Sequence, residues 1–559
     1  MESDRTTADR TGSVRLIPLG GLGEFGLNAM VLEWNGELLL VDAGVQFATA
    51  EMPGVDSVVP DFEYLAARRE RLHGILLTHG HEDHIGALSF ALAAAPAPVY
   101  ASRLTLGFVR RRLAERGAKA ELRTLRPGEP VEIGPFRVHP IRVAHSVTDS
   151  LALAIETPAG VVLASGDFKI DPTAPPAERT DLEALSAWGE RGVLALLSDS
   201  TGVEQPGLTP GEDAVRPAFE EVLARTRGRV LVSCFATSIP RIQTVADLAA
   251  RAGRPVAFLG RRMIDNTETA IDLGLLRLTG VTRAEPAALG DAWTGRAIVF
   301  VSGSQGEPLS ALSMIALGEH RDVAAGPGDS VVLSARAIPG NERHVSRLIS
   351  NLFRLGCDVV HPGTARVHVS GHGSRDDLVE LLKRTRPRYL VPIHGEYRML
   401  AQHARLAAQA GLPADRVLVA EDGDVLRLAH DGARREERVA AGRVLLDRGG
   451  SSEIEDLVVR DRRHISSEGI VVPIVVVDRQ TGQLEGAPEV VTRGIVAGGE
   501  ARELADEASR LLQGAIDGRP VEERLDAELT RERVKDELRR FFKRRTQRRP
   551  MVIPVVMEV

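Results

Sequence analysis

The sequence predicts an α/β protein in which one α/β unit is inserted into another and a smaller unit follows. From Val14 to about Leu197, short aliphatic runs end in Gly, Asp or His, which is typical of buried strands that carry polar loops. From Thr209 to Gly356, strand-like and helix-like segments alternate strictly, as in a parallel sheet covered by helices. After Gly356 the first pattern resumes, which indicates that the first unit is discontinuous in sequence.

The composition fits a globular chain of several domains. It has 559 residues, of which 43% are hydrophobic, and domains usually span roughly 100 to 200 residues. The polar start MESDRTTADRTGSV lacks the apolar core of a signal peptide. No apolar run of about 18 residues occurs, so we expect a cytoplasmic protein without membrane contact. The only two cysteines, Cys234 and Cys357, exclude a disulfide framework and a thiolate zinc cage.

In the first unit, ELLLVDAG, GILLTHG and VVLASGD are predicted strands with polar ends. The glycines of GLGEFG match a dinucleotide-binding fingerprint, but that fingerprint needs a helix after its last glycine. The following NAMVLEWNGELLLVD instead predicts two strands joined by a turn at Asn35-Gly36. We therefore expect no nucleotide cofactor.

The inserted unit and the end of the chain complete the organisation. Predicted helices are GEDAVRPAFEEVLARTRG, RIQTVADLAARAG, SALSMIALGE and NERHVSRLISNLFRLG, and the strands between them are RVLVSCF, PVAFLG, AIVFVSGS and SVVLSA. A charged stretch then predicts a linker. The expected boundaries are 14–208 and 357–429 for the first unit, 209–356 for the inserted unit, 430–455 for the linker and 456–559 for the last unit.

The stretch LLTHGHEDHIG, residues 76–86, concentrates metal-ligand residue types. His79 and His81 are two positions apart, so in an extended loop their rings project to the same side. Asp83 and His84 precede a predicted helix start at Ile85, which would direct them to a second position. Further candidates end predicted strands: His145, Asp167 and His394. A single histidine is more simply explained as structural, but the compact cluster favours metal binding.

These motifs carry a family resemblance. VDAG, THGHEDHIG, AHS, SGDFK and PIHGE resemble the signature of the metallo-β-lactamase fold, and the inserted unit with LLSDST and VHVSGHGS is similar to the β-CASP nucleases. PLGGLGEFG, GSQGEP, IPGNE, RDRR and RRPMVIPVVMEV resemble the bacterial ribonuclease J family. The resemblance implies a metallo-β-lactamase αββα sandwich, an inserted parallel α/β β-CASP domain and a small α+β C-terminal domain.

The resemblance also implies two metal positions: His79, His81 and His145 at one, Asp83, His84 and His394 at the other, with Asp167 between them. Imidazoles and carboxylates without thiolate suit Zn²⁺, and Mn²⁺ is the alternative. Two divalent ions about 3.5 to 4 Å apart supply a hydroxide at neutral pH and neutralise charge on a phosphodiester. Asp42 would orient a ligand from behind, or would only close a turn at its strand end. We expect Glu82 to be exposed to solvent.

The family pattern further implies catalytic roles for Asp83, Asp199 and His372. Asp199 would orient His372 or another imidazole, or would only cap a turn, and His372 would contact the phosphate or protonate the leaving 3′ oxygen. A 5′-monophosphate pocket is implied at His368, Val369, Ser370, Gly371 and His372, with Ala236 and Ser238.

The chain departs from the family pattern near this pocket. Where the family usually has Asn-Ile-His-Arg, this chain has Ser238-Ile239-Pro240-Arg241. After SDST, where the family commonly has Asn-Ala, it has Gly202-Val203. Pro240 supplies neither a cation nor a backbone donor. We therefore expect a weaker preference for the 5′ end than a full pocket would give.

Basic stretches suggest RNA contacts or solvated helix faces. They comprise Arg68, Arg69 and Arg71, the run Arg110 to Arg112, and RRFFKRRTQRR at 539–549. The net charge of -7 disfavours general polyanion binding, so local patches must bind any RNA. Phe541 and Phe542 lie in a helical pattern, so we expect them in a core.

The expected function is that of a two-metal ribonuclease with 5′-to-3′ exonuclease and endonuclease activity on single-stranded RNA, in rRNA processing and mRNA decay. Expected partners are RNA with a 5′-monophosphate, further copies of the chain in a homodimer or dimer of dimers formed through the C-terminal domain, and RNA-decay or ribosome-associated proteins. The alternatives are a DNA-directed or RNA 3′-processing β-CASP nuclease and a non-catalytic RNA-binding subunit. The complete ligand set disfavours the non-catalytic subunit.

Overall fold

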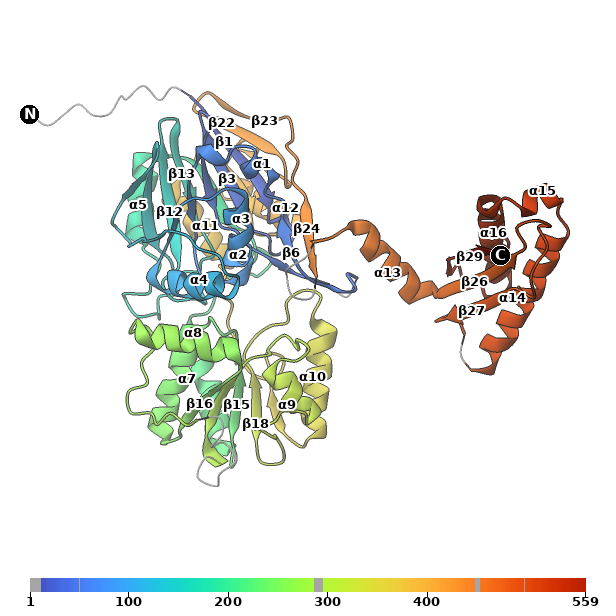
Figure 1. Cartoon of the computed structure of the whole chain (residues 1–559). Helices are drawn as coiled ribbons and strands as arrows, with labels where there is room; N and C mark the ends of the chain where they lie inside the picture. The colour runs from blue at the N-terminus through green and yellow to red at the C-terminus, as the bar shows by residue number, and fades with distance from the viewer. Residues whose placement is uncertain (1–11, 50, 286–294, 448–452, 497) are drawn as a thin grey trace, which may run out of the picture. The chain divides into compact units, whose positions relative to one another are not determined.

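The computed structural model describes residues 12–49, 51–285, 295–447, 453–496 and 498–559 (Figure 1). Residues 1–11 of the polar start and residues 448–452 of the expected linker lie outside this range. Contacts divide the chain into two units, one reaching Val444 and the other formed by 48–57 with Leu445–Val559. None of the helices in the described ranges combines the length and apolar character that a membrane crossing needs.

The first unit contains a sandwich of two sheets. One sheet has eight strands in the order β23 (Gly432–Glu436), β22 (Val425–Ala429), β1 (Val14–Gly20), β3 (Ala29–Trp34), β4 (Glu37–Val41), β7 (Leu72–Leu76), β8 (Val99–Ala101) and β9 (Leu122–Thr124). The other has six, in the order β10 (Val131–Ile133), β11 (Phe136–Arg142), β12 (Leu151–Thr157), β13 (Gly160–Ala164), β14 (Val193–Asp199) and β20 (Tyr389–Ile393). Leu32 and Leu39 of the first sheet share a core with Leu153 and Leu197 of the second, so the sheets face each other.

Helices cover the outer faces of the sandwich. Apolar side chains of α5 (Leu182–Arg191), α11 (Arg375–Thr385) and α12 (Tyr397–Gln409) pack on the six-stranded sheet. On the other side lie α1 (Glu63–Ala66), α3 (Leu88–Ala94) and α4 (Arg103–Glu115), and α4 contacts β8 and β9 (Figure 1). The predicted αββα sandwich is confirmed.

The inserted part has a parallel sheet of five strands, in the order β16 (Val256–Leu259), β17 (Ile298–Val301), β15 (Val230–Ser233), β18 (Ser330–Leu333) and β19 (Asp358–Val360). Its helices are α6 (Arg216–Arg225), α7 (Ile239–Ala252), α8 (Arg261–Asp272), α9 (Ala311–Leu317) and α10 (Glu342–Arg354). Strand β19 lies beyond the predicted end at Gly356, because Gly356, with φ 82°, ends the helical segment and one more strand follows.

Two local expectations have different outcomes. The Asn35-Gly36 turn is confirmed: both residues have positive φ, 51° and 80°, and Trp34 pairs with Glu37. The stretch expected as a linker instead includes β23, which pairs with β22, and also β24 (Arg443–Asp447) and β25 (Glu453–Ile454). The charged side chains of β23 fit an edge strand, whose outer side faces water.

The C-terminal unit is α+β, as predicted. Strand β26 (Ile470–Val477) pairs with β27 (Glu489–Arg493), β28 (Met551–Val552) and β29 (Val555–Glu558). The helices of this unit are α13 (Asp456–Glu468), α14 (Gly499–Asp517), α15 (Val521–Arg524) and α16 (Ala527–Thr546). Phe542 is fully buried in its core and Phe541 packs against that core, which confirms their expected position.

Candidate metal centre and catalytic site

The candidate ligands lie where strands of the sandwich end. Strand β7 leads to His79, β13 leads to Asp167 and β20 leads to His394. Parallel strands bring their carboxyl ends to one edge of a sheet, where ligand sites form. Helix α2 (Glu82–Ile85) begins earlier than predicted, so Asp83 and His84 lie on the helix rather than before it. His81, with extended backbone, is its N-cap residue.

Four imidazoles surround one oxygen of Asp167. The distances from Asp167 Oδ2 to the Nε2 atoms of His84, His79, His394 and His145 are 3.3, 3.4, 3.7 and 3.8 Å. This oxygen is buried and accepts no hydrogen bond from the described residues. Buried polar atoms are almost always satisfied, so an unsatisfied carboxylate oxygen ringed by ligand nitrogens fits a cation position.

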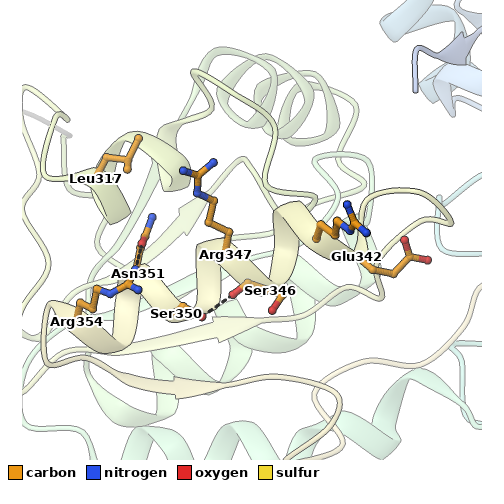
Figure 2. Close-up of a pocket in the computed structure, with 8 residues that line it drawn as sticks. Leu317, Glu342, Ser346, Arg347, Ser350, Asn351 and Arg354 are labelled. Carbon is orange, nitrogen blue, oxygen red and sulfur yellow. Dashed lines mark hydrogen bonds between the residues drawn. The ribbon is translucent and has the colours of Figure 1, made fainter. Parts of the chain in front are cut away.

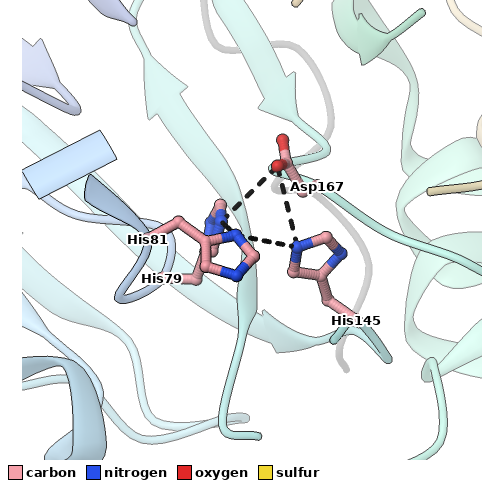
Figure 3. Close-up of side chains that lie close together, drawn as sticks. All are labelled: His79, His81, His145 and Asp167. Carbon is pink, nitrogen blue, oxygen red and sulfur yellow. Dashed lines mark hydrogen bonds and ion pairs between the residues drawn. The ribbon is translucent and has the colours of Figure 1, made fainter. Parts of the chain in front are cut away.

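The ligand atoms fall into two neighbouring groups. In the first, shown in Figure 3, His79 Nε2 is 3.1 Å from His81 Nδ1, which is 3.2 Å from His145 Nε2, and Asp167 completes the group. The second group consists of Asp83, His84 and His394. Asp83 Oδ2 lies 3.3 Å from His394 Nε2. The structure thus brings together all seven residues expected to bind metal.

A third group overlaps the other two. It consists of Asp167, Asp199, His372 and His394, with His372 Nδ1 3.9 Å from Asp167 Oδ2. His372 Nδ1 is closer to Asp199 Oδ2, at 2.8 Å. Asp199 Oδ1 also lies 3.5 Å from His394 Nδ1, so this carboxylate faces both imidazoles. The other edge of the His372 ring is directed away from Asp199, and its side chain is 21% exposed.

Acceptors behind the imidazoles fix their orientation. Asp42 Oδ2 is 2.8 Å from His84 Nδ1. The carbonyl of Gly371 is 2.8 Å from His145 Nδ1. A carbonyl only accepts, so Nδ1 of His145 carries the proton and its Nε2 lone pair faces Asp167. A Cβ at Gly371 would lie 2.7 Å from the His145 ring, so this approach requires glycine.

Charge is unevenly distributed among the imidazoles. Burial lowers the pKa of His79 and of His145 well below the usual value, and lowers the pKa of His81 to about 4. Burial acts in the same direction on His84 and His394. There, neighbouring carboxylates, first of all Asp167, outweigh burial and raise the pKa well above its usual value.

The carboxylates show the complementary effect. Burial alone would raise the pKa of Asp83, Asp167 and Asp199, but nearby imidazoles outweigh it and lower all three pKa values. These carboxylates are therefore ionised and need positive charge beside them. A bound divalent cation would supply that charge in place of imidazole protons.

The residues of the expected phosphate pocket come from the start of α7 and from residues 368–372. Arg241 of α7 donates to the carbonyl of Val367 at 3.0 Å and so ties α7 to the segment that begins with His368. Ser238 is buried at the N-cap of α7. Burial, with the charges of Arg241 and Arg336, lowers the pKa of His368 to about 3, so His368 is neutral.

The remaining pocket residues differ in exposure. Val369 and Gly371 are buried, while Ser370 and Ala236 are half-buried. Ser370 Oγ accepts from the backbone N–H of His372 at 3.0 Å. This hydrogen bond fixes the backbone just before the His372 ring.

Several residues near the ligands were not predicted. Thr78 donates from its backbone and its hydroxyl to Asp42. The Thr201 hydroxyl is 2.6 Å from His394 Nδ1, and the Phe235 ring lies 6.3 Å from that of His81. Thr78 could have been predicted, because it directly precedes His79 in the sequence. No pattern in the sequence points to Thr201 or Phe235.

Glu82 differs from expectation. Instead of facing solvent, it pairs with Arg112 and, at 3.0 Å, with Arg262, and its side chain is 26% exposed. The helical turn directs Glu82 away from Asp83, toward α4 and α8, which each present an arginine.

The sandwich and its histidine and aspartate cluster define a metal-dependent hydrolase of the metallo-β-lactamase superfamily. Residues 22–202 match the family model "Metallo-beta-lactamase superfamily". Residues 227–352 match "Ribonuclease J, beta-CASP domain", 359–418 match "Zn-dependent metallo-hydrolase RNA specificity domain" and 457–559 match "Ribonuclease J C-terminal domain".

Similar proteins agree with these matches. Ribonuclease J 1 of Streptococcus pyogenes is 36% identical over 98% of this chain and 98% of its own. Ribonuclease J of Thermus thermophilus is 37% identical over 98% of this chain and 95% of its own. A solved structure of a protein of unknown function from Enterococcus faecalis shares the fold over 75% of this chain and all of its own, with a TM-score of 0.51 and 14% identity.

The chain belongs to the ribonuclease J family. It is a metal-dependent ribonuclease and binds RNA.

Proposed function

We propose that the chain uses two divalent ions to cleave single-stranded RNA, both as a 5′-to-3′ exonuclease and as an endonuclease, in rRNA processing and mRNA decay. The observation that carries this proposal is the unsatisfied Asp167 Oδ2 among four imidazoles. Ligand nitrogens converge on it from two sides, which supports two ions rather than one. The absence of thiolate ligands favours Zn²⁺, with Mn²⁺ as the alternative.

Each ion would have its own ligands. His79, His81 and His145 would hold one, and Asp83, His84 and His394 would hold the other, with Asp167 shared between them. When bound, two such ions activate water and neutralise charge on the phosphodiester.

The chain itself would manage the proton. The Asp199 carboxylate accepts from His372 Nδ1 at 2.8 Å and favours the charged imidazole. Burial alone would lower the pKa of His372, but Asp199 and Asp167 outweigh it and raise the pKa. His372 would therefore hold a proton on its free Nε2 and donate it to the leaving 3′ oxygen.

A pocket for the 5′-monophosphate would lie at residues 368–372. His368 is neutral, so positive charge there would come from Arg336 and Arg241, which both lower its pKa. Glu212 pairs with Arg241 and reduces the charge that Arg241 can offer. A modest preference for 5′-monophosphate over 5′-triphosphate RNA follows.

The C-terminal domain would join copies of the chain. Val555, Met557 and Val559 leave 37, 45 and 64% of their surface exposed. Val555 and Met557 alternate along β29, so they share one face, and Val559 directly follows the strand. Such a row of apolar side chains is typical of a surface that a partner covers.

The test compares 5′-monophosphorylated RNA, 5′-triphosphorylated RNA and DNA of the same sequence, with products mapped by length. We expect mononucleotides released from the 5′ end, faster from monophosphorylated RNA, together with internal cuts. Digestion from the 3′ end, or equal cleavage of DNA, would overturn the proposal and favour another β-CASP nuclease.

A further inference from the structure

The inserted domain carries a basic groove that the cleavage mechanism does not use. The groove has a volume of about 720 Å³ and lies along α10, with Leu317 of α9 on its other side (Figure 2). Arg343, Arg347 and Arg354 line it, with Ser346, Ser350 and Asn351 between them. Glu342 also lines the groove, at one end, and its carboxylate accepts from the Gly340 N–H. The arginines are four and seven positions apart, so they share one face of the helix.

The arginines of this groove lack acidic partners. Within the described part of the chain, the side chains of Arg343 and Arg347 form neither an ion pair nor a hydrogen bond, and the side chain of Arg354 donates only to the amide oxygen of Asn351, at 2.6 Å. Some arginines on other helices are paired, as Arg384 is with Glu380 and Arg225 with Glu221. In a chain of net charge -7, these three arginines make a local concentration of positive charge.

The spacing of the arginines suits a nucleic-acid backbone. A helix rises about 1.5 Å per residue, so Arg343 and Arg347 are about 6 Å apart along the axis, and Arg354 lies about 10 Å further. Grooves that hold single strands combine such a row of positive charge with faces on which bases stack. Leu317, which lines the groove and is 58% exposed, offers an apolar face there, and Phe353, which is 55% exposed, directly precedes Arg354 in the sequence.

A loop joins the groove to the candidate phosphate pocket. Gln305 donates to the carbonyl of Arg336 at 2.8 Å and accepts from the Ile338 N–H at 2.7 Å. Gly306 packs against the backbone of His344 on α10, where a Cβ would come within 2.8 Å. The charge of Arg336 in turn acts on His368. The groove therefore begins one loop away from the phosphate pocket.

We propose that the groove of Arg343, Arg347 and Arg354 is a second binding site for the backbone of single-stranded RNA, away from the bond that is cleaved. The proposal rests on the proposed function, because RNA is the substrate. Contacts to phosphates would be independent of sequence and sensitive to salt. Long RNA would engage both sites, and short RNA would engage only the cleavage site.

The test is the variant Arg343→Gln/Arg347→Gln/Arg354→Gln. Its control is Arg191→Gln/Arg225→Gln/Arg384→Gln, which removes the same charge from arginines that are paired with carboxylates. We expect the groove variant to raise KM for long RNA about tenfold, and to lower the slope of log Kd against log salt by about two, since each single-strand contact contributes about 0.7. Its kcat, and its KM for short RNA, should equal those of the wild type and the control.

The possible outcomes separate this proposal from the proposed function. Unchanged KM and salt slope on long RNA would refute the RNA site, and so would an equal effect of the control. An equal loss on short RNA would also refute it, because the arginines would then act on the cleavage site. If the wild type cleaved no RNA at all, the proposed function itself would fail.

Discussion

At the scale of single residues, three of the four imidazoles around Asp167 have different partners behind their rings. Asp42 holds His84, the Gly371 carbonyl holds His145 and the Thr201 hydroxyl contacts His394. The ligands themselves could be chosen from the sequence because they end strands or share one loop. Asp42 was also expected to orient a ligand, but Gly371 and Thr201 could not be chosen as partners, because Gly371 is 226 positions from His145 and Thr201 is 193 from His394.

His372 could act either as a proton donor or as a metal ligand. As a proton donor held by Asp199, its replacement in His372→Gln should lower turnover by about 10² to 10⁴ and leave metal content unchanged. Asp199→Asn should lower turnover in the same direction, because the charged imidazole loses its partner. The measurements are single-turnover cleavage and metal content per chain. Loss of metal from His372→Gln would show that His372 is a ligand, as its 3.9 Å distance from Asp167 Oδ2 allows.

Pro240 bears on the recognition of the 5′ end. It lies in the first turn of α7, where the missing N–H of proline costs no helical hydrogen bond. Pro240→His should therefore fold normally and raise the ratio of decay rates of 5′-monophosphate and 5′-triphosphate RNA. Pro240→Ala is the control, and should leave the ratio as it is. An unchanged ratio in Pro240→His would mean that position 240 does not face the terminal phosphate.

At the scale of elements, the inserted domain is tied to the helix that carries two candidate ligands. Glu82 of α2 pairs with Arg112 of α4 and Arg262 of α8. The two long helices approach closely where a Cβ at Gly107 would come within 2.4 Å of the Thr269 methyl group. The sequence could not predict this contact, because Arg262 is 180 positions from Glu82.

The short ladder of β2 (Leu22–Gly23) and β21 (Gly395–Glu396) is linked to an acidic pair. Asp422 accepts from the Leu22 N–H at 3.0 Å. Burial, and the negative charge of Glu24, raise the pKa of Asp422 to about 7, although Arg443 pairs with Glu24 and opposes the shift. A carboxyl with a raised folded pKa penalises the folded state once it ionises. The penalty is absent below the usual pKa of 3.8 and grows up to about pH 7.

Asp422→Asn should remove this penalty and keep the acceptor for Leu22. We expect the variant to melt at a higher temperature than the wild type at pH 8, with a smaller difference at pH 5. Glu24 belongs to the same acidic pair, so the difference in Tm reports the ionisation of the pair of Asp422 and Glu24. Glu421→Gln, at the exposed neighbouring carboxylate, is the control. A difference that does not grow with pH would contradict the raised pKa.

Helix starts show where local sequence reasoning fails. The predicted start at Ile85 is wrong, since α2 begins at Glu82. Apolar periodicity identifies the buried part of a helix, whereas this first turn consists of Glu82, Asp83 and His84, whose side chains face arginines of α4 and α8 or the candidate ligand site. The alternation of strands and helices in the inserted domain was predictable, because each segment is long enough to show its period.

At the scale of the whole molecule, the apolar row on β29 predicts self-association. We expect the wild type to have at least twice the mass of one chain by light scattering, and Val555→Asp/Met557→Asp to shift it toward a single chain. Leu309→Asp, at a side chain that is 73% exposed in the inserted domain, is the control and should keep the wild-type mass. An equal mass for the wild type and the β29 variant would rule out this surface.

The central claim is that seven side chains hold two divalent ions that cleave RNA. The most direct measurement is metal content per chain, taken together with RNA cleavage, for the wild type, His79→Ala and Asp167→Asn. We predict two ions in the wild type, and fewer ions with no cleavage in either variant, while circular dichroism shows an unchanged fold. Asp167→Asn keeps the shape of the side chain but removes the charge at the centre of the site. Full cleavage by either folded variant, or by metal-free wild type, would contradict the account.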